Sequence, residues 1–431
     1  MTTGKRLNEA PDDAPIPSKM KKYNDSFDDY ISNGVEVINI ILEGSPDSIP
    51  FPPLFVYQLL DKRETIYGYK GLKINIYLTK ACLHPYVQIE YTEKLTDALD
   101  LDNIFDNLFN RKYEKHLESF KQRIKEDSKY APKGKIISSF DLDEHYEIYK
   151  IQACTMKEVS NNLQALMFLF IEGLSFIDCD PYWNYYLLYK VSKDEEFTLI
   201  GYTTTYESHQ AVDKYRARIS QMLVLPSFQL KGFGAQILSS IYQDLRKDTA
   251  CFEITAEDPS DNFMALRDIY IAKTLITEVR LNCFKELKDG KKIDASNYKN
   301  FSLTEKEITA IRKEYKFTKV DVEQCFEMIV YANLDKEDEE AVRQFRIGVK
   351  KRFFIMHKET LLPNERLNKI NEGKIKNPVI IVETMEDEEE IETEKMPEVP
   401  LSQRKEILHA HYNESIAWYT KLTPKILPLL C

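Results

Sequence analysis

The chain has 431 residues, enough to bury more than one hydrophobic core, so two or three domains are expected. Its 59 Lys and Arg residues are outnumbered by 70 Asp and Glu residues, and the formal net charge of −11 argues against direct nucleic-acid binding and suits a basic partner such as a lysine-rich peptide. The seven cysteines occur singly, without a Cys-x-x-Cys pair, so neither a disulfide framework nor a metal site is indicated.

The N-terminal residues 1–28 are rich in Pro, Asp, Ser and Lys, and this composition predicts disorder. The lysines near its end, Lys19, Lys21 and Lys22, suit a solvated tail better than an import signal. The segment lacks the apolar core of a signal peptide, and the most apolar stretch, 163–176, is too short to span a bilayer. We therefore expect no membrane association.

Residues 29–134 are expected to form a small mixed α/β domain. The β-branched and aromatic content of 35–42, 74–78 and 86–91 predicts three strands, and apolar spacing over 101–124 predicts one long helix. The Pro/Gly-punctuated segment 130–135 marks the end of this domain.

Residues 135–286 are expected to form a second domain. Helical spacing over 159–170 is followed by strand-like segments at 185–191, 197–205, 218–225 and 251–256. A predicted helix from Ala235 separates the last two strands, so a right-handed crossover would make them parallel.

The remaining sequence is expected to hold a helical domain, 287–375, and an acidic segment with a C-terminal tail, 376–431. Ser302-x-x-Glu305 reads as a capping box, and two apolar stripes read as packing surfaces: Val322, Cys325, Phe326 and Ile329, then Val342, Phe345, Val349 and Phe353. The acidic run 383–394 is typical of a solvated segment, with electrostatic attraction of histones as the alternative.

The turn between the strand at 218–225 and the following helix predicts an anion-binding site. Gly232 and Gly234 let a ligand approach the backbone, and the free amides at the helix start favour an anion such as pyrophosphate. The turn lacks the Gly-Lys-Ser/Thr of a P-loop and the third glycine of a Rossmann turn.

Gln229-x-x-Gly232-x-Gly234 instead resembles the pyrophosphate loop of the GNAT acetyltransferases. Blocks at 64–73, 170–178, 220–226, 254–260 and 266–268 narrow the resemblance to the catalytic subunits of type B histone acetyltransferases, with a fungal-like form. The resemblance covers about residues 30–360. It implies an α/β (α+β) fold in which a GNAT core with a mixed sheet lies between a small mixed N-terminal domain and a helical C-terminal domain.

The resemblance also implies acetyl-CoA as co-substrate. The positions that would hold it are strand residues Met222, Leu223 and Val224, the loop residues Gln229, Leu230, Lys231, Gly232, Phe233, Gly234 and Ala235, and Ser260. Without the resemblance, the strand side chains read as core residues and Ser260 as part of a helix start.

Acetyl transfer to lysine needs a base, because a free lysine has a pKa of about 10.4 and is almost fully charged at neutral pH. The candidate carboxylates are Glu257, Asp258 and Glu172. Asp258 precedes Pro259 and reads more simply as a helix N-cap than as a base. A lone Glu at a strand end more often forms a salt bridge, but the resemblance implies Glu257 as principal base with the other two assisting. No Cys–His or Ser–His pair supports a covalent intermediate, so direct attack is expected.

Glu64, Trp183, Tyr206, Glu207 and Ser208 match positions that line the histone-tail groove in the family, although a single Trp is more often a core residue. Pro181, and a segment between Glu172 and Trp183 that is shorter than the family's, leave the groove geometry there open.

The activity implied by the resemblance is acetylation of newly made histone H4, with a WD40-repeat chaperone as partner. The implied location is the cytoplasm and nucleus, with links to chromatin and DNA damage repair. A non-catalytic histone-binding assembly factor and a small-amine acetyltransferase are the alternatives.

Overall fold

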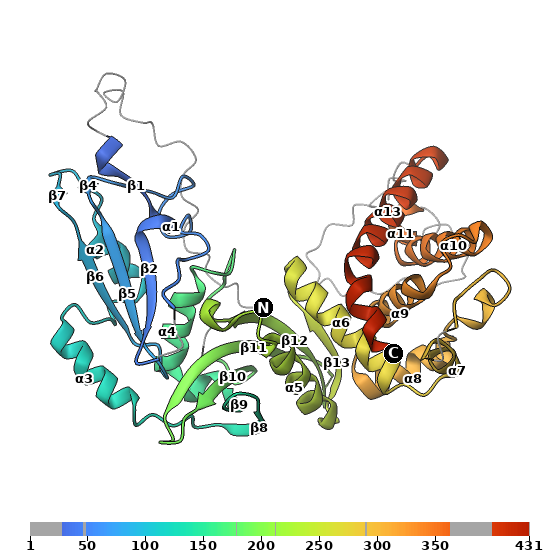
Figure 1. Ribbon diagram of the computed structural model, residues 1–431, viewed down its shortest axis with the longest axis horizontal. Coiled ribbons are helices and arrows are strands. Elements are labelled where there is room, and N and C mark those ends of the chain that lie inside the picture. Colours follow the sequence, from blue (N-terminus) through green and yellow to red (C-terminus); the bar gives the residue numbers. More distant parts are fainter. Residues whose placement is uncertain are drawn as a thin grey trace, which may run out of the picture. The chain divides into compact units, whose positions relative to one another are not determined.

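A computed structural model describes residues 28–45, 49–177, 179–211, 213–288, 291–362 and 399–430. Contacts between residues divide the chain into two compact units (Figure 1). The first contains the described residues up to Ser260 together with Lys313–Lys316, and the second contains the rest. The predictions for 1–27 and for the acidic run 383–394 fall outside the described residues.

The first unit begins with small sheets. After a short 3-10 helix, η2 (Asp28–Tyr30), a three-stranded sheet has the order β2-β5-β6, in which β2 is parallel to β5 and β5 antiparallel to β6. The pairs β1–β3 and β4–β7 are separate two-stranded sheets. The bounds are β1 (Ile31–Asn33), β2 (Ile38–Glu43), β3 (Thr65–Tyr67), β4 (Tyr69–Lys70), β5 (Lys73–Thr79), β6 (Pro85–Glu90) and β7 (Glu93–Lys94).

Two predictions for this part are wrong in detail. The strand expected over 35–42 begins with a helical turn, α1 (Gly34–Val37), because the Asn33 side chain accepts a hydrogen bond from Val35 N and caps it. The single helix expected over 101–124 is two helices, α2 (Leu101–Leu108) and α3 (Leu117–Asp127). Asn110 and Arg111 have φ of 51° and 56°, a left-handed conformation that interrupts a helix.

A six-stranded sheet forms the centre of the first unit, with the order β13-β12-β11-β10-β9-β8. Neighbouring strands are antiparallel except β12 and β13, which are parallel as predicted. The mixed sheet confirms the predicted α/β fold class. Its strands are β8 (Lys135–Asp141), β9 (His145–Gln152), β10 (Trp183–Val191), β11 (Phe197–Ala211), β12 (Lys214–Val224) and β13 (Cys251–Ala256).

Two helices accompany this sheet. The helix α4 (Lys157–Met167) follows the short η3 (Ala153–Thr155), and α5 (Phe233–Lys247) follows η4 (Pro226–Phe228). Figure 1 shows α5 lying along the sheet, and its apolar face is fully buried. Each large aliphatic side chain on that face contributes about 1.5–3 kcal/mol of burial free energy, so the start of α5 is held firmly beside the end of β12. The buried aliphatic residues are Ile237, Leu238, Ile241 and Leu245.

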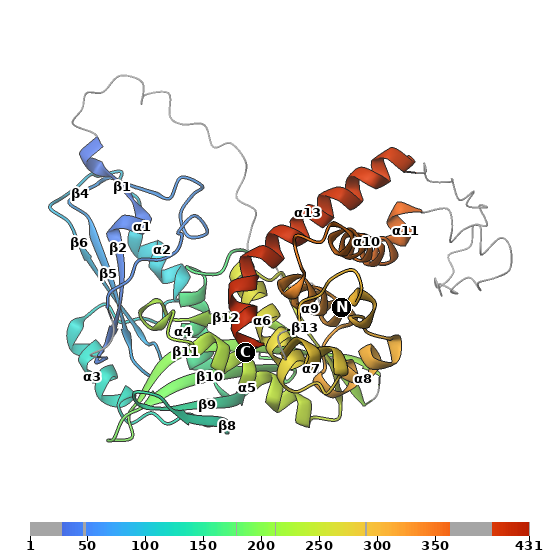
Figure 2. The same ribbon diagram turned by 45° about the vertical axis from the view of Figure 1, so that its right-hand side comes forward.

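The second unit is helical, as predicted for the C-terminal region. Its helices are α6 (Asp261–Thr277), α7 (Asn282–Lys288), most of α8 (Glu305–Tyr315), α9 (Lys319–Asn333), α10 (Glu339–Met356), α11 (Lys358–Leu361) and α13 (Leu401–Ile426), with short 3-10 turns η5 (Tyr298–Asn300) and η6 (Leu427–Leu429). Figure 2 shows α13 beside α9 and α10, which it contacts. The sequence did not predict α13.

The predicted packing of this unit is partly confirmed. All four residues of the α9 stripe are buried, whereas on α10 only Phe345 and Val349 are buried and the other two are half-buried. The capping box predicted at Ser302 is wrong by two residues, because Thr304 Oγ1 accepts from Glu307 N and Glu307 Oε2 accepts from Thr304 N. Among the described helices, none has the length and apolar character needed to cross a membrane.

Candidate active site

The two parallel strands of the large sheet separate at one end. β13 pairs with β12 only as far as Ile219 and Ala256, after which Glu257 N donates to Ile219 O at 2.9 Å. β12 continues to Val224, where the registered partners are residues of β11. The other edge of Met222–Val224 is thus free of β13, and an open strand edge can bind an extended ligand through its backbone.

A β-bulge lies at the point where the strands separate. Thr204 is paired with Gln221 and Thr205 with Ile219, so Ser220 has no opposite residue on β11. The extra residue changes the side-chain alternation of β12 locally. Ser220 Oγ donates a hydrogen bond of 2.6 Å to Glu257 Oε2 across the opening.

Glu257 is held by a second contact, from Arg218. Arg218 Nη1 lies 3.3 Å from Glu257 Oε1, and its guanidinium lies 5.6 Å from the centre of the Tyr206 ring. Arg218 Nε is buried and has no hydrogen-bond partner within the described ranges. The Glu257 side chain is 37% exposed, which leaves its carboxylate accessible from solvent while both oxygens are oriented.

Glu172 has a different partner. Tyr57 OH donates to Glu172 Oε1 at 2.7 Å, and burial, followed by this hydrogen bond, raises the pKa of Tyr57 to about 12. The segment after Glu172 is tied to β12, because Gln221 Nε2 donates to Ser175 O at 3.3 Å. The structure therefore places Glu172 on a loop attached to the strand beside Glu257, with its own hydrogen-bond donor.

Glu64 supports the segment that carries Tyr57. Its Oε1 accepts from Val56 N at 2.6 Å and from Tyr57 N at 3.1 Å, and its own backbone has φ of 56°. The same segment is joined to the end of α4 by Gln58, whose Nε2 donates to Phe168 O at 2.8 Å. The carboxylate expected to contact substrate thus has a structural role in orienting Tyr57.

Asp258 does not cap a helix, so that interpretation is wrong. The following helix, α6, begins at Asp261, three residues later, and Ser260 directly precedes it. Asp258 is exposed and has φ of 35°, a left-handed conformation that Asp tolerates better than most residues. Its proposed part in proton transfer remains a prediction.

The loop predicted to bind pyrophosphate leads into the start of α5. Gly232, with φ of 88°, is the N-cap of α5, and a Cβ built on it would meet no atom within 4 Å. Leu230 and Lys231 are exposed, and Gln229 Nε2 donates to Val224 O at 2.9 Å, which joins the loop to the open strand. Phe233 is buried whereas Ala235 faces solvent, so the first amides of α5 are accessible to an anion.

The predicted groove residues other than Glu64 lie together on β10 and β11, beside the part of β12 that precedes the opening. Trp183 is paired with Tyr206 and their ring centres are 5.0 Å apart, and Tyr206 in turn is opposite Arg218. Glu207 accepts from Asn184 Nδ2 at 2.9 Å, and Ser208 Oγ accepts from Gln210 Nε2 at 3.2 Å. An aromatic surface therefore leads to the Arg218–Glu257 pair.

The sequence interpretation missed Tyr57, Arg218 and Ser220. Arg218 and Ser220 are two residues apart on β12. The two-residue period of a strand is the signal that could have placed them on one face. The bulge that brings Ser220 to Glu257 leaves no signal of its own in the sequence.

Together, the separated parallel strands, the glycine turn and the oriented carboxylate define an acyltransferase with the core predicted from its GNAT-like motifs. Residues 30–172 match the family model described as "Histone acetyl transferase HAT1 N-terminus". The histone acetyltransferase type B catalytic subunit of Mycosarcoma maydis is 28% identical, over 79% of this chain and 84% of its own length. The human counterpart is 28% identical over 75% of this chain and 81% of its own length. The counterpart from Candida albicans is 32% identical over 58% of this chain and 66% of its own length.

The chain is thus a relative of the type B histone acetyltransferase catalytic subunits of fungi and mammals, and the predicted resemblance is confirmed. Among solved structures, an aminoglycoside acetyltransferase from an uncultured soil metagenomic sample is 15% identical. It covers 32% of this chain and 91% of its own with a TM-score of 0.23, a likeness too low to carry an argument.

Proposed function

We propose that this enzyme transfers the acetyl group of acetyl-CoA to lysines of the N-terminal tail of free, newly synthesised histone H4. The observation that carries the proposal is the position of Glu257, which lies where β12 and β13 separate and is oriented by Ser220 and Arg218. The names of the relatives support a histone as the acceptor, and the surplus of acidic residues in this chain suits a basic tail.

The residues present fit acetyl-CoA. The solvent-facing turn at Gly232 leaves room for a pyrophosphate at the start of α5, and the open edge of Met222–Val224 suits the amides of a pantetheine arm. Gln229–Ala235 would bind the pyrophosphate, and Met222–Val224 would bind the pantetheine arm. Ser260 would add a contact to the pyrophosphate. The bound co-substrate supplies an acetyl group activated as a thioester.

The protein's own part in the reaction is to deprotonate and position the acceptor. A lysine of the tail must lose its proton before it attacks directly, and Glu257 is the base, acting on the amine or through one water. Glu172 and Asp258 add negative charge near the ammonium group. Trp183 and Tyr206 would pack against the aliphatic part of the acceptor segment, with Glu207 and Ser208 extending the groove, and Glu64 would act through Tyr57, which it orients.

We further propose a WD40-repeat histone chaperone as partner and a cytoplasmic and nuclear location. Both rest on the similarity to type B catalytic subunits. Co-purification of the full chain with a WD40 chaperone in a gel-filtration experiment tests the partner, and separate elution at micromolar concentrations would contradict it.

The experiment that tests the function uses the full chain, acetyl-CoA and a histone H4 tail peptide, with acetylation followed by mass spectrometry. A polyamine of similar charge is the parallel acceptor. Modification of tail lysines at a rate well above that of the polyamine is the expected result. Tight peptide binding without transfer would favour the assembly factor, and preferential modification of the polyamine would favour a small-amine enzyme.

A further inference from the structure

A cavity lies in the first unit among elements that the proposed reaction does not use. Its volume is about 500 Å³, within the range of small-ligand sites, and three separate parts of the chain line it. These are the turn after β5, the segment from the α2–α3 connection into α3, and the start of α4. The lining residues used below are His84, Arg111, Lys112, Arg123, Lys157 and Asn161.

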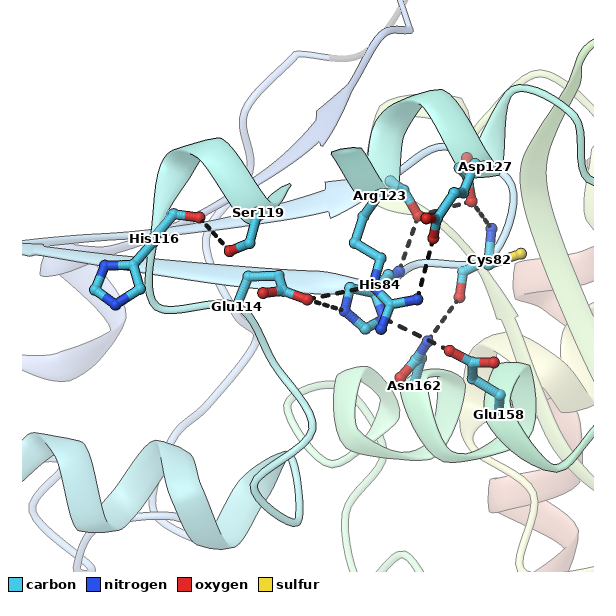
Figure 3. A network of polar contacts seen from close by, with 11 residues as sticks. Cys82, His84, Glu114, His116, Ser119, Arg123, Asp127, Glu158 and Asn162 are labelled. Carbon is cyan, nitrogen blue, oxygen red and sulfur yellow. Dashed lines mark hydrogen bonds and ion pairs between the residues drawn. The ribbon is translucent and has the colours of Figure 1, made fainter. Parts of the chain in front are cut away.

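The floor of this cavity is a fixed polar network (Figure 3). His84 Nε2 lies 3.3 Å from Glu114 Oε1, which also accepts from Arg123 Nε at 3.2 Å. Burial, followed by the nearby Arg123 charge, lowers the pKa of His84, so the ring is neutral at pH 7. Asn162 Nδ2 donates to Cys82 O at 3.1 Å, which fixes the start of α4 to the turn after β5.

The carboxylate of Asp127 makes that turn rigid. Its Oδ1 accepts from Thr79 Oγ1 and Cys82 N, and its Oδ2 from Ala81 N, each at 2.8 Å. The buried side of the cavity is therefore preorganised by hydrogen bonds rather than filled by apolar packing.

The charges that face the cavity are mainly positive, in a protein whose net charge is −11. Arg111, Lys112, Arg123 and Lys157 outnumber the two carboxylates, Glu114 and Glu158. Glu114 is already paired with Arg123, whereas Lys112 and Lys157 form no ion pair within the described part of the chain. Arg111 is 82% exposed and reaches only to 4.0 Å from Asp106. Lys112 and Lys157 thus remain for a ligand, and Arg111, held only by this long contact, can join them.

The backbone at Arg111 and at the residue before it is strained. Asn110 and Arg111 are consecutive non-glycine residues in the left-handed region, which costs about 1–2 kcal/mol for a residue such as Arg. Such strain is concentrated at ligand-binding segments, where it positions side chains. Here it turns the chain between α2 and α3 so that residues 111–114 line the cavity.

We propose that this cavity binds a small ligand bearing a phosphate group, held by Arg111, Lys112 and Lys157 and hydrogen-bonded by the Asn161 amide. Arg and Lys are the side chains that bind phosphate oxygens through charge-assisted hydrogen bonds. The inference is independent of the proposed acetyl transfer, since none of these residues belongs to the candidate active site.

Titration calorimetry of the full chain with inorganic pyrophosphate tests the proposal. The variant K112E/K157E should weaken binding at least tenfold. The matched control is K121E/K125E, which makes the same change in net charge on exposed residues of α3 outside the cavity and should leave binding within twofold. The control also accounts for pyrophosphate bound at the Gly232 loop, which both variants retain.

Hydrogen exchange locates the site independently of the variants. Pyrophosphate should slow exchange in peptides covering 109–116 and 157–162. Equal weakening in the two variants, unchanged binding in K112E/K157E, or protection confined to 229–236 would overturn the proposal. Histone acetylation by K112E/K157E should equal that of the unaltered chain, so a failure of this inference is separable from a failure of the proposed function.

Discussion

Ser220 Oγ donates a 2.6 Å hydrogen bond to Glu257 Oε2, and this contact joins β12 and β13 just where their backbones cease to pair. The length is typical of a bond from a hydroxyl to a charged carboxylate. Together with Arg218 on the other oxygen, it fixes the rotamer of a side chain that would otherwise turn freely at a strand end. The bulge at Ser220 thus lies where the strands separate, and its hydroxyl helps to orient the carboxylate.

Replacing Glu257 with Gln should lower turnover by roughly 10²-fold or more, because the amide keeps the size of the side chain but cannot accept the lysine proton. The measurement is the steady-state rate with saturating acetyl-CoA and H4 peptide. Glu195→Gln is the control, because Glu195 is exposed at the β10–β11 hairpin, the opposite end of those strands from Trp183. Turnover of Glu257→Gln close to that of the control would remove the assigned role.

Replacing Tyr57 with Phe tests whether Glu172 assists. The substitution removes the donor to Glu172 Oε1 while retaining the ring, so turnover should fall several-fold if an oriented Glu172 contributes. With a pKa of about 12, the Tyr57 hydroxyl remains protonated and donates throughout the assay range of pH 7–10. The ratio of the turnover of the unaltered chain to that of Tyr57→Phe should therefore be constant over that range. A ratio that approaches one at the alkaline end would show that Tyr57 ionises and contradict this arrangement.

Replacing Gly232 with Ala tests the phosphate-binding loop. A Cβ would meet no neighbour there, so the cost arises from the left-handed backbone, about 1 kcal/mol, and from displacement of the amides at the start of α5. We expect the KM for acetyl-CoA to rise at least tenfold and thermal stability to fall slightly. Gly44→Ala is a matched control, with φ of 77° and only a 3.8 Å contact, and should change stability alone. Equal KM values in the two variants would exclude the loop from co-substrate binding.

The sequence was sufficient where periodicity and special residues act locally. β13 was predicted with its exact bounds, because Cys251–Ala256 is a short β-prone run that ends at a charged residue. The helix expected from Ala235 was predicted from its apolar spacing, and α5 begins two residues earlier, at Phe233, after the N-cap Gly232. The prediction of one long helix over 101–124 was wrong because the apolar spacing continues through Asn110 and Arg111. These residues adopt a left-handed conformation, and no glycine in the sequence indicates the break.

The site was harder to predict because its contacts depend on register between distant strands. Glu257 was a candidate from its position at a strand end, and the family resemblance implied its role. Its partners Arg218 and Ser220 depend on the pairing of β12 with β13 and on the bulge in β12. Asp258 was interpreted as a cap because Asp-Pro often begins a helix, and the backbone instead turns at φ of 35° and starts α6 at Asp261. Tyr57 lies 115 residues from Glu172, and no local pattern relates the two.

Replacing Asp268 with Asn tests the packing of the second unit. Asp268 on α6 is buried, and its Oδ2 accepts a 2.7 Å hydrogen bond from Trp418 Nε1 on α13. Burial raises the pKa of Asp268 above its ordinary value of 3.8, so the folded state binds this proton more tightly than the unfolded state. The stabilising contribution of the protonated group is therefore complete at low pH and is lost as the pH rises through the raised pKa.

Asn cannot ionise, and its side-chain oxygen can still accept from Trp418, so Asp268→Asn should gain stability relative to the unaltered chain as the pH rises. The gain is about 1.4 kcal/mol for each unit by which the pKa is raised. Urea unfolding of the full chain at pH 4 and pH 7 measures this difference, with the exposed Glu337→Gln as the charge-matched control. A free-energy difference that stays constant between the two pH values, or that changes equally in the control, would show that the carboxyl is not desolvated by the contact between α6 and α13.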